Sequence, residues 1–383
     1  MSSVLPPASA APLLSLDDMA RAAEAIAPAS LWDFVEGGGG NELSLRANRA
    51  ALDNLYLVPR VLRDVTGTST AGTIVATPAS MPLAIAPMSY QRMVNSDGEL
   101  AAARAAKLAN VPFTVPMFSS VTVERIAESG ADLWFQLYWL RDRGKTAEIL
   151  DRATAAGCRA IVLTVDVPRL GRRLRDLRNG FALAPSVRAV HFDTGKDGDT
   201  GKDGDTGKDG AHSRDDGSLD VSHYVDMFDP GLTWSDVEWL RARTSLPVVL
   251  KGILAPEDAV EAARIGADAL VVSNHGGRQL DGAIAGIAAL PAIRESVGDS
   301  CELLVDGAIR SGPDLLKAIA LGASGVLLGR PVLHGLIVGG EAGVGQTLSL
   351  LRADLDDALA LAGCRDIHDA AGLRLTRSPG AWN

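Results

Sequence analysis

Short apolar runs alternate with helix-like segments from residue 83 onward, and this alternation constrains the fold more than any other feature. Each run is bounded by turn residues, as a buried strand would be. The runs cover residues 83–87, 113–115, 133–138, 160–166, 247–251, 269–273, 302–306 and 325–328. Strands that alternate with helices favour parallel pairing, and eight such units within about 250–300 residues predict a (β/α)8 barrel.

An open, doubly wound sheet is the alternative architecture for such a pattern. That fold would usually carry a G-x-G-x-x-G motif after its first strand. Here the first strand is followed by Pro87-Met88-Ser89-Tyr90, which does not resemble that motif. We therefore prefer the barrel, a TIM barrel of the α/β class.

The segments outside the barrel predict a helical cap and one insertion. Residues 1–14 are expected to be disordered, and helices are expected to begin at Ser15, at residue 29 and at residue 42. Four glycines at residues 37–40 end the second helix. After the fourth strand, residues 193–217 repeat Gly-Lys-Asp-Gly-Asp-Thr. This repeat predicts a flexible, low-complexity insertion within a single domain over residues 15–383, because an EF-hand would need a closing Glu and flanking helices.

Composition and charge exclude several functional classes. The net charge of −10 argues against a nucleic-acid binder, which needs a basic surface. The three cysteines lie far apart without metal-ligand spacing, which favours reduced thiols in a cytoplasmic protein and no metal site. The first residues lack the features of a secretory signal. No apolar run reaches the roughly 18 residues of a membrane span, so no membrane association is expected.

Polar residues gather where the predicted strands end, which is where barrels of this kind place their active sites. Together they would form a pocket with a base, carboxylates and several cations. They are Gln136, Tyr138, Thr164, Asp166, Lys251, Ser273, His275 and Asp306, with Arg169, Arg172, Arg173, Arg278, Arg310 and Arg330 shortly beyond.

The loops after the seventh and eighth strands predict a phosphate site. Asp306-Gly307-Ala308-Ile309-Arg310-Ser311-Gly312 and Leu328-Gly329-Arg330-Pro331 supply glycine amides, a helix N-terminus and two arginines. Either arginine alone could be a surface residue in a salt bridge. As a pair in these two loops, they favour phosphate binding.

These motifs resemble those of the FMN-dependent α-hydroxy acid oxidases and dehydrogenases. The likeness runs from about residue 16 to residue 364. It is densest at Ser273-Asn274-His275-Gly276-Gly277-Arg278-Gln279-Leu280-Asp281, Thr164-Val165-Asp166-Val167-Pro168, Phe135-Gln136-Leu137-Tyr138, Leu250-Lys251-Gly252 and Gly329-Arg330-Pro331. The stretch Arg172-Arg173-Leu174-Arg175-Asp176-Leu177-Arg178-Asn179-Gly180-Phe181 is similar to members that oxidise 4-hydroxymandelate.

The resemblance implies roles for the reacting groups. His275 would be the general base that takes a proton from the α-carbon or the hydroxyl of the substrate, and Asp166 would pair with the imidazolium that forms. Arg278 and Arg173 would hold the substrate carboxylate. Tyr138 would hydrogen-bond the hydroxyl as it becomes a keto oxygen.

The resemblance also implies FMN as cofactor. Lys251 would lie by the pyrimidine edge of the flavin. The remaining contacts would be Gln136, Thr164 and Ser273 on the isoalloxazine, Asp306 on the ribityl hydroxyls, Arg310 and Arg330 with Gly307 and Gly329 at the phosphate, and Pro87, Met88 and Ser89 beside the ring. Barrel-interior packing is the alternative role for Gln136 and Thr164.

Departures from the family pattern bear on the substrate. Glycolate-type members carry a carboxylate-binding Tyr where this chain has Phe34, and Phe118 replaces part of a Ser-Ser-Trp stretch. Both changes favour an aromatic (S)-2-hydroxy acid, 4-hydroxymandelate or mandelate, over lactate or glycolate, which stay the alternative. Ser89, near the oxygen-reactive side, leaves oxidase and dehydrogenase both open, although we expect O2 as acceptor. The resemblance implies a homotetramer.

Overall fold

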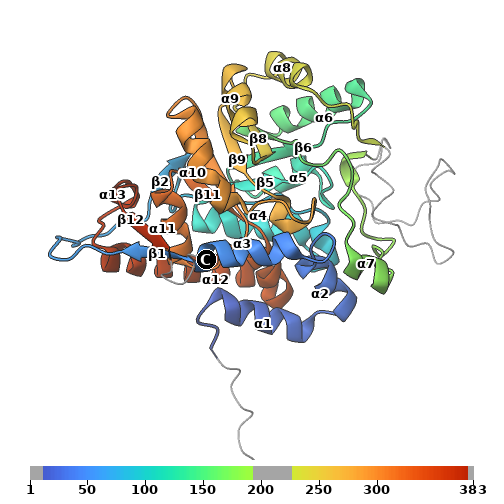
Figure 1. Ribbon diagram of the computed structural model, residues 1–383. Helices are drawn as coiled ribbons and strands as arrows, with labels where there is room; N and C mark the ends of the chain where they lie inside the picture. Colours follow the sequence, from blue (N-terminus) through green and yellow to red (C-terminus); the bar gives the residue numbers. More distant parts are fainter. Residues whose placement is uncertain (1–11, 193–226, 378–383) are drawn as a thin grey trace, which may run out of the picture.

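The computed structural model describes residues 12–192 and 227–377, and its centre is a closed barrel of eight parallel strands (Figure 1). The strands pair in sequence order, and the last pairs with the first, which confirms the predicted barrel. They are β4 (Leu83–Ile85), β5 (Phe113–Val115), β6 (Leu133–Leu137), β7 (Ala160–Thr164), β8 (Val248–Ile253), β9 (Ala269–Val272), β10 (Glu302–Asp306) and β11 (Gly325–Leu328).

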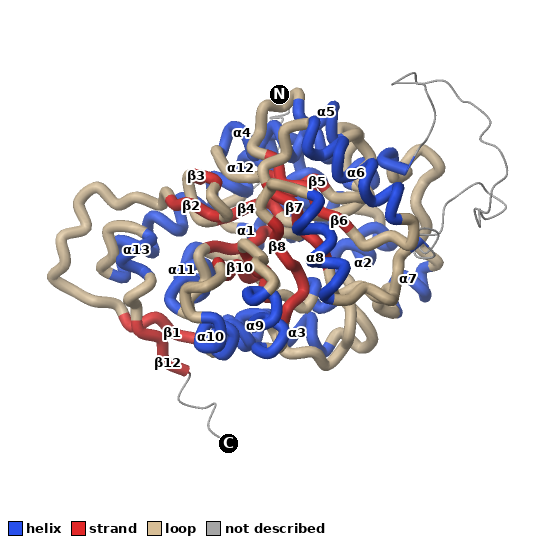
Figure 2. Tube along the Cα trace, turned by 90° about the horizontal axis from the view of Figure 1, so that it is seen from above, coloured by secondary structure: helices blue, strands red, loops and turns tan. Residues whose placement is uncertain are grey.

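Helices surround the barrel (Figure 2). They are α4 (Gly98–Ala109), α5 (Val123–Ala127), α6 (Arg143–Ala155), α8 (Trp234–Arg243), α9 (Pro256–Arg264), α10 (Gly286–Val297), α11 (Gly312–Ala320) and α12 (Arg330–Ala362). α12 is broken at Gly339 and Gly340, whose backbone angles are not helical. A short helix, α7 (Leu174–Asn179), follows β7 and was not predicted.

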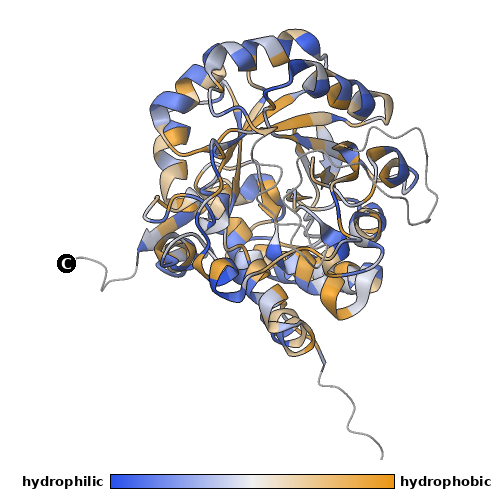
Figure 3. Ribbon diagram, turned by 90° about the vertical axis from the view of Figure 1, so that its right-hand side faces the viewer, coloured by the Kyte–Doolittle hydropathy of each residue, from blue (hydrophilic) through white to orange (hydrophobic). Residues whose placement is uncertain are grey.

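Side chains along each strand point alternately into the barrel and toward the surrounding helices, and both sets are buried. Trp134, Val162 and Val249 point inward with other side chains of one buried cluster, whereas Phe135 and Leu163 join the layer between strands and helices. The strands are therefore apolar along almost their whole length, as Figure 3 shows by their colour. This double burial explains why the strands could be recognised from continuous apolar runs.

The predicted N-terminal cap is present as α1 (Leu16–Ile26), α2 (Ala29–Glu36) and α3 (Leu43–Asp53). The Ser15 hydroxyl accepts a hydrogen bond from the backbone N–H of Asp18 and thereby caps α1, as expected. α1 packs against α12, and α3 packs against the loop after β9. The insertion at residues 193–217 and the segment before residue 12 lie outside the described residues.

Two small sheets were missed by the sequence analysis. The hairpin of β2 (Gly72–Ile74) and β3 (Thr77–Ala79) covers the end of the barrel opposite the pocket, with Ile74 and Val75 packed on barrel side chains. Glu302 accepts two hydrogen bonds of 3.0 Å from the N–H of Val75. β1 (Leu55–Val58) pairs with β12 (Arg374–Arg377) in antiparallel fashion. Such short strands carry too little periodicity to be recognised.

No helix in the described parts of the chain is long and apolar enough to cross a membrane. Cys158, Cys301 and Cys364 are buried and unpaired with one another. These thiols serve as small apolar packing groups, as the sequence suggested.

Candidate active site

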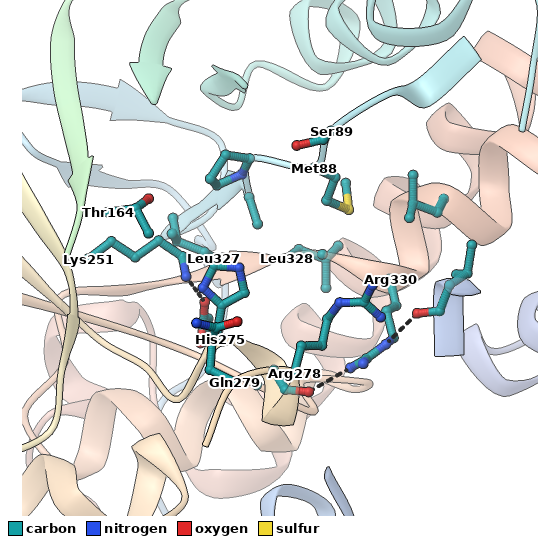
Figure 4. A pocket seen from close by; sticks show the side chains of 18 of the residues that line it. Met88, Ser89, Thr164, Lys251, His275, Arg278, Gln279, Leu327, Leu328 and Arg330 are labelled. Atoms are coloured by element: carbon teal, nitrogen blue, oxygen red, sulfur yellow. Dashed lines mark hydrogen bonds and ion pairs between the residues drawn. The ribbon is translucent and has the colours of Figure 1, made fainter. Parts of the chain in front are cut away.

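A cavity of about 210 Å³ opens at the C-terminal ends of the strands (Figure 4). Its walls come from α2 and from the loops after most of the barrel strands. The predicted site residues that line it are Phe34, Pro87, Met88, Ser89, Phe118, Tyr138, Thr164, Arg173, Lys251, His275, Arg278, Asp306, Gly307, Arg310, Gly329 and Arg330.

Asp166, Gln136 and Ser273 do not line the cavity but support residues that do. The Gln136 side chain donates to the Thr164 hydroxyl at 3.1 Å and accepts from the N–H of Met117 at 3.1 Å. The Ser273 hydroxyl oxygen accepts from Lys251 Nζ at 3.1 Å and from the N–H of His275 at 3.0 Å. Gln136 therefore holds the side chain of Thr164 in place, and Ser273 holds Lys251 and the backbone of His275.

His275 stands in a backbone conformation that costs energy. Its φ is +59°, and Gly276 and Gly277 continue in the same left-handed region. A non-glycine residue there pays roughly 1–2 kcal/mol. The Asn274 side chain accepts from the N–H of Gly277 at 3.0 Å and pairs with Asn48 of α3, which holds the turn. The glycines are thus needed for the turn that directs the imidazole into the cavity.

The imidazole of His275 pairs with the carboxylate of Asp166. Nδ1 lies 3.0 and 3.2 Å from the two carboxylate oxygens. Burial alone would raise the pKa of Asp166, but the charges of His275 and Lys251 and the His275 hydrogen bond outweigh it and hold that pKa below its ordinary value. An ionised Asp166 keeps hydrogen on Nδ1, so Nε2 is the nitrogen free for a substrate proton.

Lys251 and Asp306 form a buried ion pair beside His275. Nζ lies 3.2 Å from Oδ2 of Asp306, and both side chains are at most one-tenth exposed. Burial would lower the pKa of Lys251, but Asp306 and Asp166 raise it above its ordinary value, so the ammonium is retained. Oδ1 of Asp306 is buried without a hydrogen-bond partner among the described residues. That oxygen is available to accept from a bound molecule.

Three guanidinium groups, those of Arg173, Arg278 and Arg330, line the cavity near α2. Arg278 donates to the carbonyls of Phe34 and Gly37 at 2.8 Å each, and Arg330 donates to the carbonyl of Val35 at 2.9 Å. Burial lowers the pKa of Arg278 well below its ordinary value, and the charges of Arg173 and Arg330 add to this effect. Such crowded cations favour the binding of anions.

Aromatic rings also line the cavity. Phe34 stacks on Phe181 at 4.3 Å between centroids, and the guanidinium carbons of Arg173 and Arg278 lie 5.4 and 5.2 Å from the Phe34 centroid. Phe118 lies 5.4 Å from Tyr138. Burial, reinforced by the charge of Asp166, raises the pKa of Tyr138, so its hydroxyl stays protonated and can donate. The cavity therefore combines anion-binding groups with an apolar, aromatic surface.

Sequence reasoning missed several lining residues, because nothing but the fold brings them there. Most are apolar and indistinguishable in sequence from core residues. They are Val35, Ala86, Met93, Leu170, Leu327 and Leu333, whereas Tyr90, Val167, Gly276, Gln279, Ala308, Ile309 and Leu328 stand in motifs quoted from the sequence but were given no role of their own. Gln279 was visible only as part of the motif around His275.

The helix N-terminus expected at the phosphate site is that of α12. The first turn of α11 is already capped, since Ser311 accepts from the N–H of Asp314 and Asp354 accepts from the N–H of Gly312. α12 begins without a side-chain cap, and its first residues, Gly329 and Arg330, line the cavity. Pro331 has no N–H and the N–H of Val332 donates to the carbonyl of Gly329, so among these first residues the N–H of Arg330 is the one available to an anion.

A closed parallel barrel with this cation-rich, aromatic cavity at its C-terminal face defines a barrel enzyme for anionic ligands. The model of the FMN-dependent dehydrogenase family matches residues 23–377, so the chain belongs to that family and its cofactor is FMN.

Individual proteins similar to this chain are also hydroxy acid oxidases. The chain is 51% identical to a 4-hydroxymandelate oxidase of Amycolatopsis orientalis over 94% of this chain and 97% of the relative. It is 43% identical to an L-lactate oxidase of a Nostoc species over 88% of this chain and 91% of the relative. A solved structure of mandelate oxidase with (S)-4-hydroxymandelic acid is 50% identical, with a TM-score of 0.88 and coverage of 96% and 99%.

The residues present fit FMN. Burial lowers the pKa of Arg310 and of Arg330 because nearby carboxylates compensate these buried charges only in part, and a bound phosphate would supply the missing negative charge. Gly307, whose φ is +100°, and Gly329 line the cavity together with these arginines, so main-chain atoms are also exposed to a ligand there. The unpartnered oxygen of Asp306 suits a hydroxyl donor such as those of a ribityl chain.

Proposed function

We propose that this protein oxidises an aromatic (S)-2-hydroxy acid, 4-hydroxymandelate or mandelate, to the corresponding 2-oxo acid. The substrate loses two electrons and two protons, and O2 takes them up as hydrogen peroxide. The observation that carries the proposal is the pairing of His275 with Asp166 beside Arg173 and Arg278, under a wall that includes Phe34. Relatives named for 4-hydroxymandelate and mandelate support the aromatic class.

His275 acts as the general base in this proposal. Its Nε2 removes a proton from the α-carbon or the hydroxyl of the substrate, and Asp166 stabilises the imidazolium through Nδ1. Tyr138, whose hydroxyl is protonated, donates to the substrate oxygen as it becomes a carbonyl. FMN, when bound, would supply the two-electron redox chemistry that links the substrate to O2.

Arg173 and Arg278 hold the substrate carboxylate. Both guanidinium groups flank the ring of Phe34, so the carboxylate would be gripped next to an apolar surface. Phe118 and Tyr138, whose ring centroids lie 5.4 Å apart, also line the cavity and would contact the substrate side chain. A flat aromatic substituent gains more from such walls than a methyl group would.

The cofactor residues follow from the same arrangement. We assign Arg310, Arg330, Gly307 and Gly329 to the phosphate and Asp306 to the ribityl chain. Lys251 and Thr164 face the flavin ring, with Gln136 and Ser273 acting through them. Pro87, Met88 and Ser89 contribute the wall on the side of β4.

A short-chain 2-hydroxy acid, lactate or glycolate, is the second candidate substrate. The 43% identity to an L-lactate oxidase and the 38% identity to human 2-hydroxyacid oxidase 1 favour it. The two candidates differ only in the side chain that the aromatic wall would accommodate.

Anaerobic flavin reduction by a panel of hydroxy acids tests both. The flavin absorbance should bleach fastest with (S)-4-hydroxymandelate or (S)-mandelate, and admitting oxygen should restore it with one peroxide per turnover. Faster bleaching by lactate or glycolate would favour the alternative. No bleaching with any hydroxy acid would refute the proposal.

The organisation of the protein is part of the proposal. We propose a single catalytic domain over residues 15–383 that assembles as a cytoplasmic homotetramer. The family resemblance supports this assembly, and light scattering of the purified protein should give four chains per particle.

A further inference from the structure

Three loops meet at one junction beside the cavity. They are residues 37–40 between α2 and α3, residues 165–173 after β7, and residues 273–285 after β9. The loop after β7 carries Asp166 and Arg173, whereas the loop after β9 carries His275 and Arg278. The proposed reaction therefore needs the two barrel loops in a fixed relative position.

The side-chain amide of Gln279 joins the two barrel loops with three hydrogen bonds. Its Nε2 donates to the carbonyls of Asp166 at 2.8 Å and of Arg169 at 2.9 Å. Its Oε1 accepts from the N–H of Gly171 at 2.8 Å. Donors and acceptors match in only one orientation of the amide, because the reverse would place its oxygen against two carbonyls.

Other links between these two loops are few. In the described parts of the chain, the only other side-chain hydrogen bonds between them are those of His275 with Asp166. The loops also touch directly, since a Cβ added to Gly171 would lie 2.2 Å from the carbonyl oxygen of Arg278. The two loops are thus closely packed at this junction. Gln279 makes most of the side-chain hydrogen bonds between them.

The residues at 37–40 close the junction from the third side. The N–H of Gly39 donates to the carbonyl of Gly277, and the N–H of Gly40 donates to the carbonyl of Arg172, both at 2.8 Å. A Cβ on Gly39 would lie 2.4 Å from the carbonyl oxygen of Gln279. The four glycines that the sequence suggested as a helix stop are therefore also required by close packing.

We propose that Gln279 is a positioning residue that aligns the pair of His275 and Asp166 and the pair of Arg173 and Arg278 on one substrate. It acts by fixing the backbone at Asp166 and at Gly171 relative to the loop on which His275 stands. This inference rests on the proposed function. Losing Gln279 should impair both the proton transfer and the carboxylate grip, while leaving FMN, which is held mainly by other loops, in place.

Rapid-mixing flavin reduction by (S)-mandelate, with holoenzyme of wild type, Gln279→Leu and Gln279→Glu, tests this inference. Gln279→Leu keeps similar bulk but loses all three hydrogen bonds. We expect its limiting reduction rate to fall at least about tenfold and its apparent substrate Kd to rise several-fold, since near-attack geometry is lost. FMN content should not change.

Gln279→Glu tests the positioning role through the pH dependence of flavin reduction, which a purely structural role of Gln279 would not change. Its carboxylate can still accept from Gly171, but it faces two carbonyl oxygens, which favours the protonated form. The reduction rate of this variant, divided by that of wild type at the same pH, should therefore rise as the pH falls. A ratio that does not change with pH would contradict the positioning role.

Two further variants guard against misleading outcomes. Ser44→Ala loosens the same loop after β9, at the carbonyl of Ala283, without touching the loop after β7. It should lower Tm with little change in rate. If Gln279→Leu fails to fold, Gly171→Ala forces the junction apart by its clash with Arg278 and should show the same combined loss.

The possible failures can be told apart. If wild type itself is not reduced by any hydroxy acid, the proposed function fails. If wild type is active and Gln279→Leu, or Gly171→Ala in its place, keeps both rate and Kd within twofold, the proposal for Gln279 is overturned.

Discussion

Nδ1 of His275 lies 3.0 Å from Oδ1 of Asp166, although 109 residues separate them in the chain. The parallel barrel brings them together, since β7 and β9 flank β8 and end at the same face. The pair gives one side chain that can take a proton and another that stabilises the resulting charge. Its neighbours determine what each of the following changes should do.

Replacing Asp166 by Asn should slow the reaction rather than weaken binding. The neutral amide no longer stabilises imidazolium at His275, so the rate of flavin reduction should fall roughly 100-fold, within the usual range for general acid–base groups. Substrate affinity should change little, because Asp166 does not line the cavity. Rapid-mixing spectroscopy measures both. Asp229→Asn, which breaks a remote pair with Arg143, is the control and should be near wild type.

Replacing Arg278 by Met should chiefly weaken the grip on the carboxylate. A charge-assisted hydrogen bond contributes about 1.5–3 kcal/mol, so kcat/KM should fall roughly 10- to 100-fold or more. Steady-state kinetics with (S)-mandelate measure this loss. Arg178→Met removes an exposed arginine from α7 and should have no comparable effect. Equal losses in both variants would point to general electrostatic attraction instead.

Replacing Phe34 by Tyr should shift the choice of substrate. The new hydroxyl would lie near Arg173 and Arg278, whose guanidinium carbons are 5.4 and 5.2 Å from the ring centroid. An extra donor for the carboxylate compensates a substrate that lacks an aromatic ring. The ratio of kcat/KM for mandelate to that for lactate should therefore fall about tenfold, the equivalent of one hydrogen bond. An unchanged or increased ratio would contradict our assignment of Phe34 to the substrate.

Replacing Lys251 by Met should destabilise the protein and impair the flavin site. The change leaves the buried carboxylate of Asp306 without its cation, and breaking such a pair costs about 3–5 kcal/mol. Urea unfolding of the FMN-free protein should show this loss. The double variant Lys251→Met, Asp306→Asn removes both charges and should recover part of the stability, but neither variant should regain wild-type flavin reduction.

Glu36 should make stability depend on pH in the acid range. Although burial alone would raise its pKa, the hydrogen bond from His334 and the charges of Arg330 and Arg310 lower the pKa of Glu36 from 4.5 to about 2. The folded state thus prefers the ionised carboxylate. Its contribution, up to about 3 kcal/mol, is fully present above pH 4.5 and is lost as the pH falls toward 2.

The variant Glu36→Gln should therefore show a flatter dependence than wild type. Unfolding free energies from urea titrations between pH 6 and pH 3 measure the two slopes. Glu24→Gln, at an exposed position of α1, should keep the wild-type slope. A parallel loss of stability in Glu36→Gln and wild type would show that other carboxylates control acid unfolding.

The barrel could be predicted because its strands are buried on both faces. Residues 160–164, for example, are all apolar except the last, and each is buried. The hairpin of β2 and β3 escaped prediction because its three-residue strands contain Gly72 and Pro78 and gain their apolar contacts only from the barrel. β1 and β12 pair across more than 300 residues, and no local pattern reports such a contact.

The sequence by itself determined the repeated strand–helix order and the residue types of the site, because periodicity and chemical identity are local properties of a chain. It also placed His275 and Arg278 on one turn. Only the tertiary structure decided which distant groups meet them: Asp166 at the imidazole, the carbonyls of α2 at Arg278, and Gln279 between two loops. Such contacts depend on barrel closure and loop packing, which are set by distances between segments far apart in the sequence.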